Sequence, residues 1–150
     1  MTTALTPNAP NHDGLGAMAS RFVEIHSLPW EDTRFPGVQA KTLLVDRRTG
    51  LLTVLLKMAP GAMLPDHEHV QIEQTFVIEG ALVCGEGTCT AGNFVWRPAG
   101  SRHTAGTPNG GLMLAMFQLP NKFFDDDGGA IDMLSQDWND FWGDASANNL

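Results

Sequence analysis

The sequence predicts an all-β fold, either a sandwich or a barrel, and three observations support this fold class. Short β-prone runs alternate with glycine and proline turns along most of the chain. Apolar residues with helical spacing are nearly absent before residue 134. The 150 residues suit one domain, which can bury a core without help from disulfides or a structural metal.

Seven runs are predicted to form strands, because each is rich in β-branched, aromatic or aliphatic residues and is bounded by turn residues. They are residues 22–25, 38–46, 51–58, 74–78, 81–84, 94–96 and 112–119. Glycine and proline between the runs predict turns at residues 47–50, 60–61 and 79–80. Many short strands joined in this way are typical of sandwiches and barrels.

The two ends of the chain differ from its middle. Residues 1–20 are rich in Thr, Pro, Asn and Gly, so we expect a flexible N-terminal arm, followed by a single domain over residues 21–150. Near the C-terminus, Leu134, Trp138, Phe141 and Trp142 recur at helical spacing, with Ser135 in position to cap a helix. This pattern predicts a short amphipathic helix.

Charge and hydropathy exclude several classes of function. The formal net charge is −8, which argues against an extended nucleic-acid surface, because phosphate binding needs clustered Lys and Arg. No window has the length and purity of a transmembrane helix, and the first twenty residues lack the regions of a signal peptide. We therefore expect a cytoplasmic protein without membrane contact.

The two cysteines, Cys84 and Cys89, flank a predicted two-residue turn at Glu86-Gly87. That register would place them opposite each other, at a distance that permits a disulfide. A reducing cytosol favours two reduced structural thiols instead, and a redox role is the alternative.

Metal-ligand residues gather first in residues 61–80, at His67, His69 and Glu73. Residues i and i+2 of a strand point to the same side, so the two imidazoles can aim at one point. The residues between His69 and Glu73 suit a tight connection, after which the next strand can bring a carboxylate to the same point. A lone His-x-His pair in a strand is more often an ordinary surface or core feature than a metal site.

The second cluster covers residues 92–103, where Gly92, Pro98 and Gly100 set turns and His103 opens the following segment. A strand antiparallel to the first pair would deliver His103 as a third imidazole. Three neutral nitrogens and one carboxylate suit Fe(II), Mn, Co, Ni, Cu or Zn. Four protein ligands on one side of an octahedron leave two positions open, which marks a catalytic site rather than a closed structural one.

Both segments, GAMLPDHEHVQIEQTFVIEG and GNFVWRPAGSRH, resemble the two signature motifs of the cupin superfamily. The departure is Thr107, which stands where the family usually has Asn, with Asn109 close by; this affects a turn and not a ligand. The resemblance implies a jelly-roll barrel, also called a double-stranded β-helix, that is usually a homodimer. It does not name a reaction, because this scaffold hosts many activities.

Other segments resemble a subgroup of cupins. They are Leu28-Pro29-Trp30, Pro36-Gly37-Val38 and the tail LPNKFFDDDG at residues 119–128. The subgroup contains acetylacetone-cleaving and dihydroxyacetophenone dioxygenases and the zinc-binding cupin half of ChrR-type anti-sigma factors. The resemblance implies that the three histidines hold one divalent metal, Fe(II) by preference with Zn, Mn or Ni as alternatives. Glu73 is then a fourth ligand or a partner of the ligands.

The main hypothesis is a metal-dependent dioxygenase that uses O2 to cleave a C–C bond in a small diketone or hydroxy-ketone. Candidate walls of the substrate pocket are Trp96, Met113, Met116 and Phe117, whose alternative is ordinary core. Arg102, beside His103, is a candidate for pairing with an anionic substrate group, and a solvent-facing arginine is the alternative.

Two alternatives to the dioxygenase stay open. A non-redox isomerase, lyase or hydrolase needs the same ligands plus a nearby general acid or base. A non-catalytic zinc-binding sensor domain is the second alternative. The ChrR-type arrangement has a helical sigma-binding domain ahead of the barrel, whereas only about twenty irregular residues precede the first predicted strand here.

Overall fold

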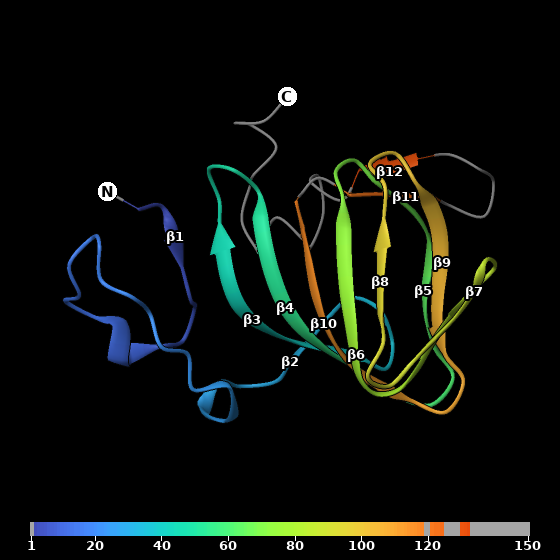
Figure 1. The fold of residues 1–150 in the computed structure, drawn as a ribbon, viewed down its shortest axis with the longest axis horizontal. Helices are drawn as coiled ribbons and strands as arrows, with labels where there is room; N and C mark the ends of the chain where they lie inside the picture. Colours follow the sequence, from blue (N-terminus) through green and yellow to red (C-terminus); the bar gives the residue numbers. More distant parts are fainter. Residues whose placement is uncertain (1, 119–120, 125–129, 133–150) are drawn as a thin grey trace.

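The computed structural model describes residues 2–118, 121–124 and 130–132 as a curled antiparallel sheet that closes into a jelly-roll barrel (Figure 1). The described strands follow the order β1-β3-β4-β10-β6-β9-β5-β11-β12, with β2 beside β3 and with β7 and β8 beside β6. The all-β prediction is therefore confirmed. The predicted C-terminal helix falls outside the described residues.

The elements have the following bounds. The strands are β1 (Ala4–Leu5), β2 (Glu31–Asp32), β3 (Val38–Asp46), β4 (Leu51–Met58), β5 (Ala62–His69), β6 (Glu73–Cys84), β7 (Gly87–Thr90), β8 (Phe94–Arg97), β9 (Arg102–Thr107), β10 (Gly111–Gln118), β11 (Asn121–Phe124) and β12 (Ala130–Asp132). Two short 3-10 helices, η1 (Pro10–His12) and η2 (Ile25–Ser27), precede β2.

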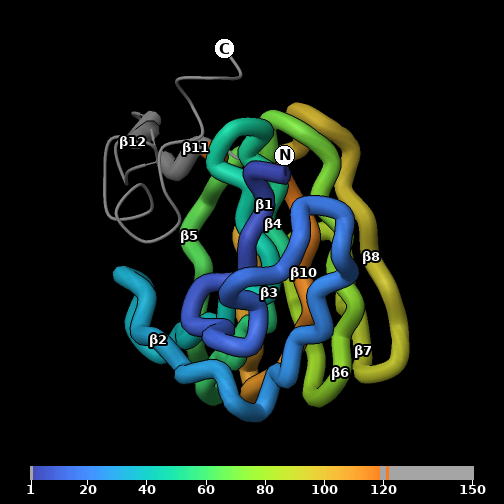
Figure 2. Tube along the Cα trace, turned by 90° about the vertical axis from the view of Figure 1, so that its left-hand side faces the viewer, coloured from blue at the N-terminus to red at the C-terminus, as the bar shows by residue number. Residues whose placement is uncertain are grey.

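The predicted strands at residues 38–46 and 51–58 coincide with β3 and β4. The predicted strand at residues 22–25 is wrong, because Phe22 is 79% exposed and η2 begins at Ile25. This segment lies against β3, where the Lys41 ammonium donates a hydrogen bond of 2.8 Å to the Ile25 carbonyl. Figure 2 shows the N-terminal segment passing over the side of the barrel formed by β3 and β4.

A turn was expected at residues 79–80, and this prediction is also wrong, because β6 runs through both positions. Gly80 has φ +72°, and a β-carbon there would collide with the backbone carbonyl of Gly110. The register between β6 and β10 shifts two residues earlier, where Ile78 has no partner on β10. A bulge at Ile78, followed by Gly80, thus bends β6 instead of ending it, so that its first half pairs with β8 and its second half with β7.

The hairpin between β6 and β7 has a different register from the predicted one. Cys84 lies opposite Gly87 and Cys89 opposite Leu82, so the turn is Gly85-Glu86 and the cysteines do not face each other. Both thiols are free and partly buried in the structure. No helix in the described part of the chain is long and apolar enough to span a membrane.

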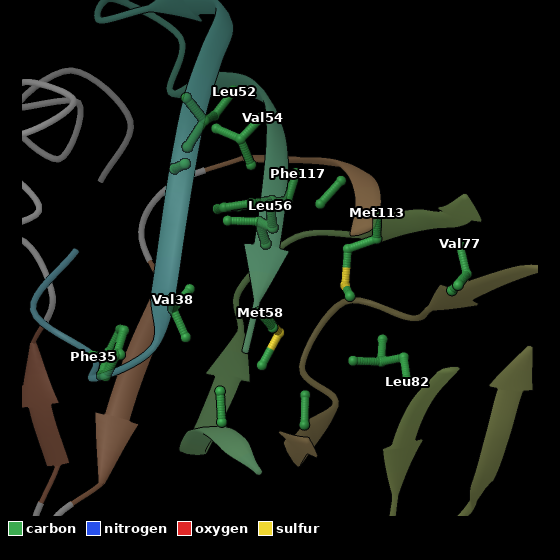
Figure 3. Close-up of a cluster of buried hydrophobic side chains, with 14 of the residues drawn as sticks. Phe35, Val38, Leu52, Val54, Leu56, Met58, Val77, Leu82, Met113 and Phe117 are labelled. Atoms are coloured by element: carbon green, nitrogen blue, oxygen red, sulfur yellow. The ribbon is translucent and has the colours of Figure 1, made fainter. Parts of the chain in front are cut away.

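Apolar side chains from the inner faces of both halves of the sheet fill the barrel (Figure 3). Leu52, Val54, Met58, Val77 and Met113 are among the most deeply buried, each at most 2% exposed. Each such side chain contributes about 1.5–3 kcal/mol of hydrophobic stabilisation. This packing holds in place the strand ends that carry the polar residues described next.

Candidate metal centre

Three strand ends meet at one rim of the barrel and carry the four predicted ligands. β5 ends at His69 and β6 begins at Glu73, so the short connection at residues 70–72 keeps these two residues together. His103 is the second residue of β9 and lies directly opposite His67 in the antiparallel β5–β9 pair. The arrangement expected from the i, i+2 spacing and from the antiparallel delivery of His103 is therefore the one observed.

The ligand atoms of these four residues converge on one point. Nε2 of His69 lies 3.0 Å from Nε2 of His67 and 3.1 Å from Nε2 of His103. Oε2 of Glu73 lies 2.9 Å from the same His69 nitrogen. One ligand atom from each residue falls within 4.8 Å of all the others, and all four residues are buried.

Each imidazole is oriented by a hydrogen bond at its other nitrogen. Nδ1 of His67 is 2.7 Å from the Pro65 carbonyl, and Nδ1 of His103 is 3.0 Å from the Thr104 carbonyl. Nδ1 of His69 is 3.2 Å from Oδ1 of Asn121, a residue only 3% exposed. All three partners are acceptors, so we assign the proton of each neutral ring to Nδ1 and a lone pair to Nε2.

Burial keeps protons off two of the three imidazoles, His67 and His103, at neutral pH. Desolvation, together with repulsion from His69, lowers the pKa of His67 to about 4. Desolvation and repulsion from His67 lower the pKa of His103 to about 3. Burial opposes ionisation of Glu73, yet its hydrogen bond with His69 and the nearby imidazoles hold its pKa below the ordinary value. Glu73 is thus an anion, and the nearby imidazoles of His67 and His103 are neutral at this pH.

Three nitrogen lone pairs and a carboxylate oxygen converging within a few ångströms need a positive charge among them. Because the pKa values of His67 and His103 are low, neither of these imidazoles supplies that charge by protonation at neutral pH. A divalent transition metal fits this set of donors, since imidazole and carboxylate are its usual ligands and must be deprotonated to bind it. The residues present therefore fit a metal ion.

The predicted pocket residues divide between the inside and the outside of the barrel. Phe117 is 6% exposed, and its ring packs edge-on against His69 with centroids 5.9 Å apart. Met113 is 2% exposed and belongs to the apolar core, whereas its neighbour Met116 is half-buried. Trp96 is 56% exposed, and Arg102 is exposed and forms an ion pair with Asp66. The structure thus brings only Phe117 of this set to the cluster.

Sequence reasoning missed Arg97 and the role of Asn121. Arg97 ends β8 directly opposite Glu73, is 6% exposed, and places Nε 3.3 Å from Oε1 of Glu73. Asn121 begins β11 opposite His69. The signal for Asn121 was its place in the tail motif at residues 119–128. Thr107 stands where the cupin motif usually has Asn. Its hydroxyl donates a hydrogen bond of 3.1 Å to the Ala59 carbonyl, which fixes the turn next to it.

Comparison with known proteins places this geometry in context. The model of the ChrR cupin-like domain family matches residues 18–122. No curated protein matches the chain in sequence. A proposed acetylacetone dioxygenase of Methylibium petroleiphilum has 21% identity and a TM-score of 0.72, covering 85% of this chain and 97% of its own.

Two further structures share the fold. An acetylacetone dioxygenase of Acinetobacter johnsonii has 20% identity and a TM-score of 0.69, with 90% of this chain and 97% of that chain covered. The anti-sigma factor ChrR of Rhodobacter sphaeroides, in complex with SigE, has 24% identity and a TM-score of 0.54. That match covers 63% of this chain and 51% of the other. At these identities the likeness shows the fold alone.

Proposed function

From the premise that this chain belongs to the ChrR cupin-like domain family, we propose that it is a metal-dependent dioxygenase. Its substrate would be a small enolisable diketone or hydroxy-ketone, and its metal Fe(II). The observation that carries the proposal is the convergence of three anchored imidazoles and Glu73 on one buried point. The two acetylacetone dioxygenase folds support this choice of reaction.

The residues of the chain prepare the centre in two ways. The hydrogen bonds at the three Nδ1 atoms hold the Nε2 lone pairs in place before metal binding, so little reorganisation is needed. The Phe117 ring against His69 excludes water from one side of the cluster. When bound, the metal supplies a Lewis acid and a template for an enolate.

In the proposed reaction both atoms of O2 enter the substrate and its C–C bond breaks. The products are two carbonyl-containing fragments, so no external reductant is required. Glu73 is a carboxylate, and it would offset one of the two positive charges of a divalent ion. Arg97 restrains the other oxygen of that carboxylate.

Oxygen uptake tests the reaction directly. Iron-loaded protein should consume one O2 per substrate with at least one member of a panel of β-diketones and hydroxyacetophenones. Zinc-loaded protein is the matched control and should consume none. If the iron-loaded protein is inert across the panel, or turns a substrate over under strict anaerobiosis, the dioxygenase proposal is wrong.

A zinc-binding sensor domain is the second candidate, and the family model named for ChrR favours it. Under this proposal the same four residues hold Zn in a closed site, without turnover. Elemental analysis of protein purified without added metal, combined with a search for a co-purifying sigma factor, separates the two. Zinc together with a bound sigma factor would support the sensor.

We also infer that the protein forms a homodimer through the outer face of β6 and β8. Phe76 and Phe94 lie opposite each other there, and with Ile78 and Trp96 they are between 41% and 56% exposed. These four side chains leave roughly 300–400 Å² of apolar surface uncovered, comparable to the largest patch on a typical monomer. A stable interface covers about 800 Å² per partner, so the patch suits the core of one.

Light scattering tests the dimer. The wild-type protein should have twice the mass of the chain at micromolar concentration, and the Phe94→Glu/Trp96→Glu variant should be monomeric. Met18→Glu is the control, because Met18 is 97% exposed and lies outside the patch. A monomeric wild-type protein, or a double variant that stays dimeric, would show that this face does not join two copies.

A further inference from the structure

A groove of about 470 Å³ opens on the inner side of the bent ribbon formed by β6, β7 and β8. Its volume is within the usual range for small-molecule sites. A larger hollow of about 680 Å³ lies among residues 32–39 and 57–60 and includes none of the four clustered residues. The 470 Å³ groove is likewise lined by none of these four residues, but Arg97, whose guanidinium pairs with Glu73, forms part of its wall.

The groove follows from the strand registers. Leu82 lies opposite Cys89 and Cys84 opposite Gly87, so the two cysteines share the inner face with Leu82. On β8, Val95 and Arg97 alternate inward in the same way, and Arg97 lies opposite Glu73. The groove therefore runs from the β6–β7 turn to the residue that contacts the metal cluster.

Arg97 has unused hydrogen-bonding capacity. A guanidinium carries five N–H donors, yet within the described part of the chain its ion pair is with Glu73 and its Nε makes no hydrogen bond. At 3.3 Å the Glu73 oxygen is close enough for charge attraction but lies off the N–H direction. A buried guanidinium in this condition is stabilised by an added anion.

The charges around the groove also favour an anion at its inner end. Burial raises the pKa of the Cys89 thiol, while the charge of Arg97 opposes that rise, so the thiol is neutral near pH 7 and does not neutralise Arg97. With a divalent metal bound, Glu73 offsets one of the ion's two positive charges, and the guanidinium of Arg97 brings the net charge of this group back to plus two. Glu86, at the β6–β7 turn, is the one acidic residue that lines the groove.

We propose that this groove binds a small organic anion, such as a carboxylate or an enolate, with its charged group on Arg97 and its apolar part between Val95 and Cys89. The anion thereby sits beside Glu73 at the edge of the metal centre. This anion site rests on the proposed function, and it implies that the substrate binds as an anion. Anion binding is measured separately from O2 consumption, so the two proposals fail independently.

The test is a titration of zinc-loaded, ¹⁵N-labelled protein with benzoate, followed through the side-chain Nε–Hε resonances of arginine in NMR spectra. One buried resonance, assigned to Arg97 by its loss in Arg97→Lys, should shift and saturate. Arg97→Gln should weaken benzoate at least tenfold. Arg102→Gln is the matched control, since Arg102 is exposed and bound to Asp66, and it should change the affinity less than twofold.

A second variant keeps the inference falsifiable if Arg97→Gln fails to fold. Val95→Trp fills the groove without removing the charge of Arg97, and it should also weaken benzoate at least tenfold. Glu86→Gln should strengthen binding at low salt, because it removes a negative charge from the groove. If benzoate binds with unchanged affinity in Val95→Trp, or produces no saturable shift in the wild-type protein, the groove is not the anion site.

Discussion

The hydrogen bond from His69 to Asn121 offers the sharpest test of how the metal centre is built. Replacing Asn121 by Leu keeps the size of the side chain but removes the acceptor that lies 3.2 Å from Nδ1. Asn121 is 3% exposed and His69 is 1% exposed, so water cannot readily replace the lost partner. An unpartnered buried N–H costs about 1–3 kcal/mol.

The same loss should appear in metal affinity. Removing the partner that orients a metal-binding histidine weakens affinity about 10–100-fold, or about 1.4–2.7 kcal/mol, in agreement with the hydrogen-bond estimate. Competition with a chromophoric chelator measures the Zn affinity of wild-type and Asn121→Leu proteins.

Gln118→Leu is the matched control for this experiment. It makes a similar amide-to-leucine change three positions earlier in the chain, where the side-chain amide donates to the Thr49 carbonyl at 3.3 Å and to none of the four clustered residues. Its zinc affinity should equal that of the wild type. If Asn121→Leu also binds zinc within twofold of the wild type, Asn121 does not determine the orientation of His69.

Three further predictions follow from the site and the fold. Glu73→Gln should leave the protein folded but weaken zinc at least tenfold by chelator competition, because it removes the anionic donor; a loss under threefold would mean that Glu73 does not contact the metal. In chelator-treated protein, the free energy of unfolding should fall by about 3 kcal/mol as the pH drops from 6.5 towards 4, because His67 binds a proton in the unfolded chain but has a pKa of about 4 in the folded site. Urea titrations at several pH values measure this change, and a flat profile would contradict a buried neutral imidazole at His67. Gly80→Ala should destabilise the protein by about 3 kcal/mol or more, because it adds a collision with Gly110 to the strain of a positive φ. Gly92→Ala is the control and should cost about 1 kcal/mol, because Gly92 has φ +83° but open space around it. Equal losses of stability in thermal unfolding would show that the close approach of Gly110 is unimportant.

The four candidate ligands were predictable because their placement depends on local rules. Strand alternation puts His67 and His69 on one side, and a short connection brings Glu73 back to the same rim. His103 required one assumption, an antiparallel neighbour, which the turn residues before it already favoured. Strands β3 and β4 were predictable for a similar reason, since each is a continuous apolar run between clear turns.

Tertiary packing decided the features that depend on contacts between distant parts of the chain. The bend of β6 near Gly80 looked like a turn, because glycine occurs in both, and the close approach of Gly110 to Gly80 is visible only in the tertiary structure. Arg97 and Arg102 are both near His103 in sequence, but the pairing of β8 with β6 turns Arg97 towards Glu73 and strand alternation leaves Arg102 outside.

Spacings of a few positions therefore suffice to predict which residues converge on the metal centre. The partners that hold these residues come from long-range pairing, because Asn121 reaches His69 across 52 positions of sequence through the pairing of β11 with β5. Long-range register depends on bulges and on the packing of the whole barrel, and no short segment carries that information.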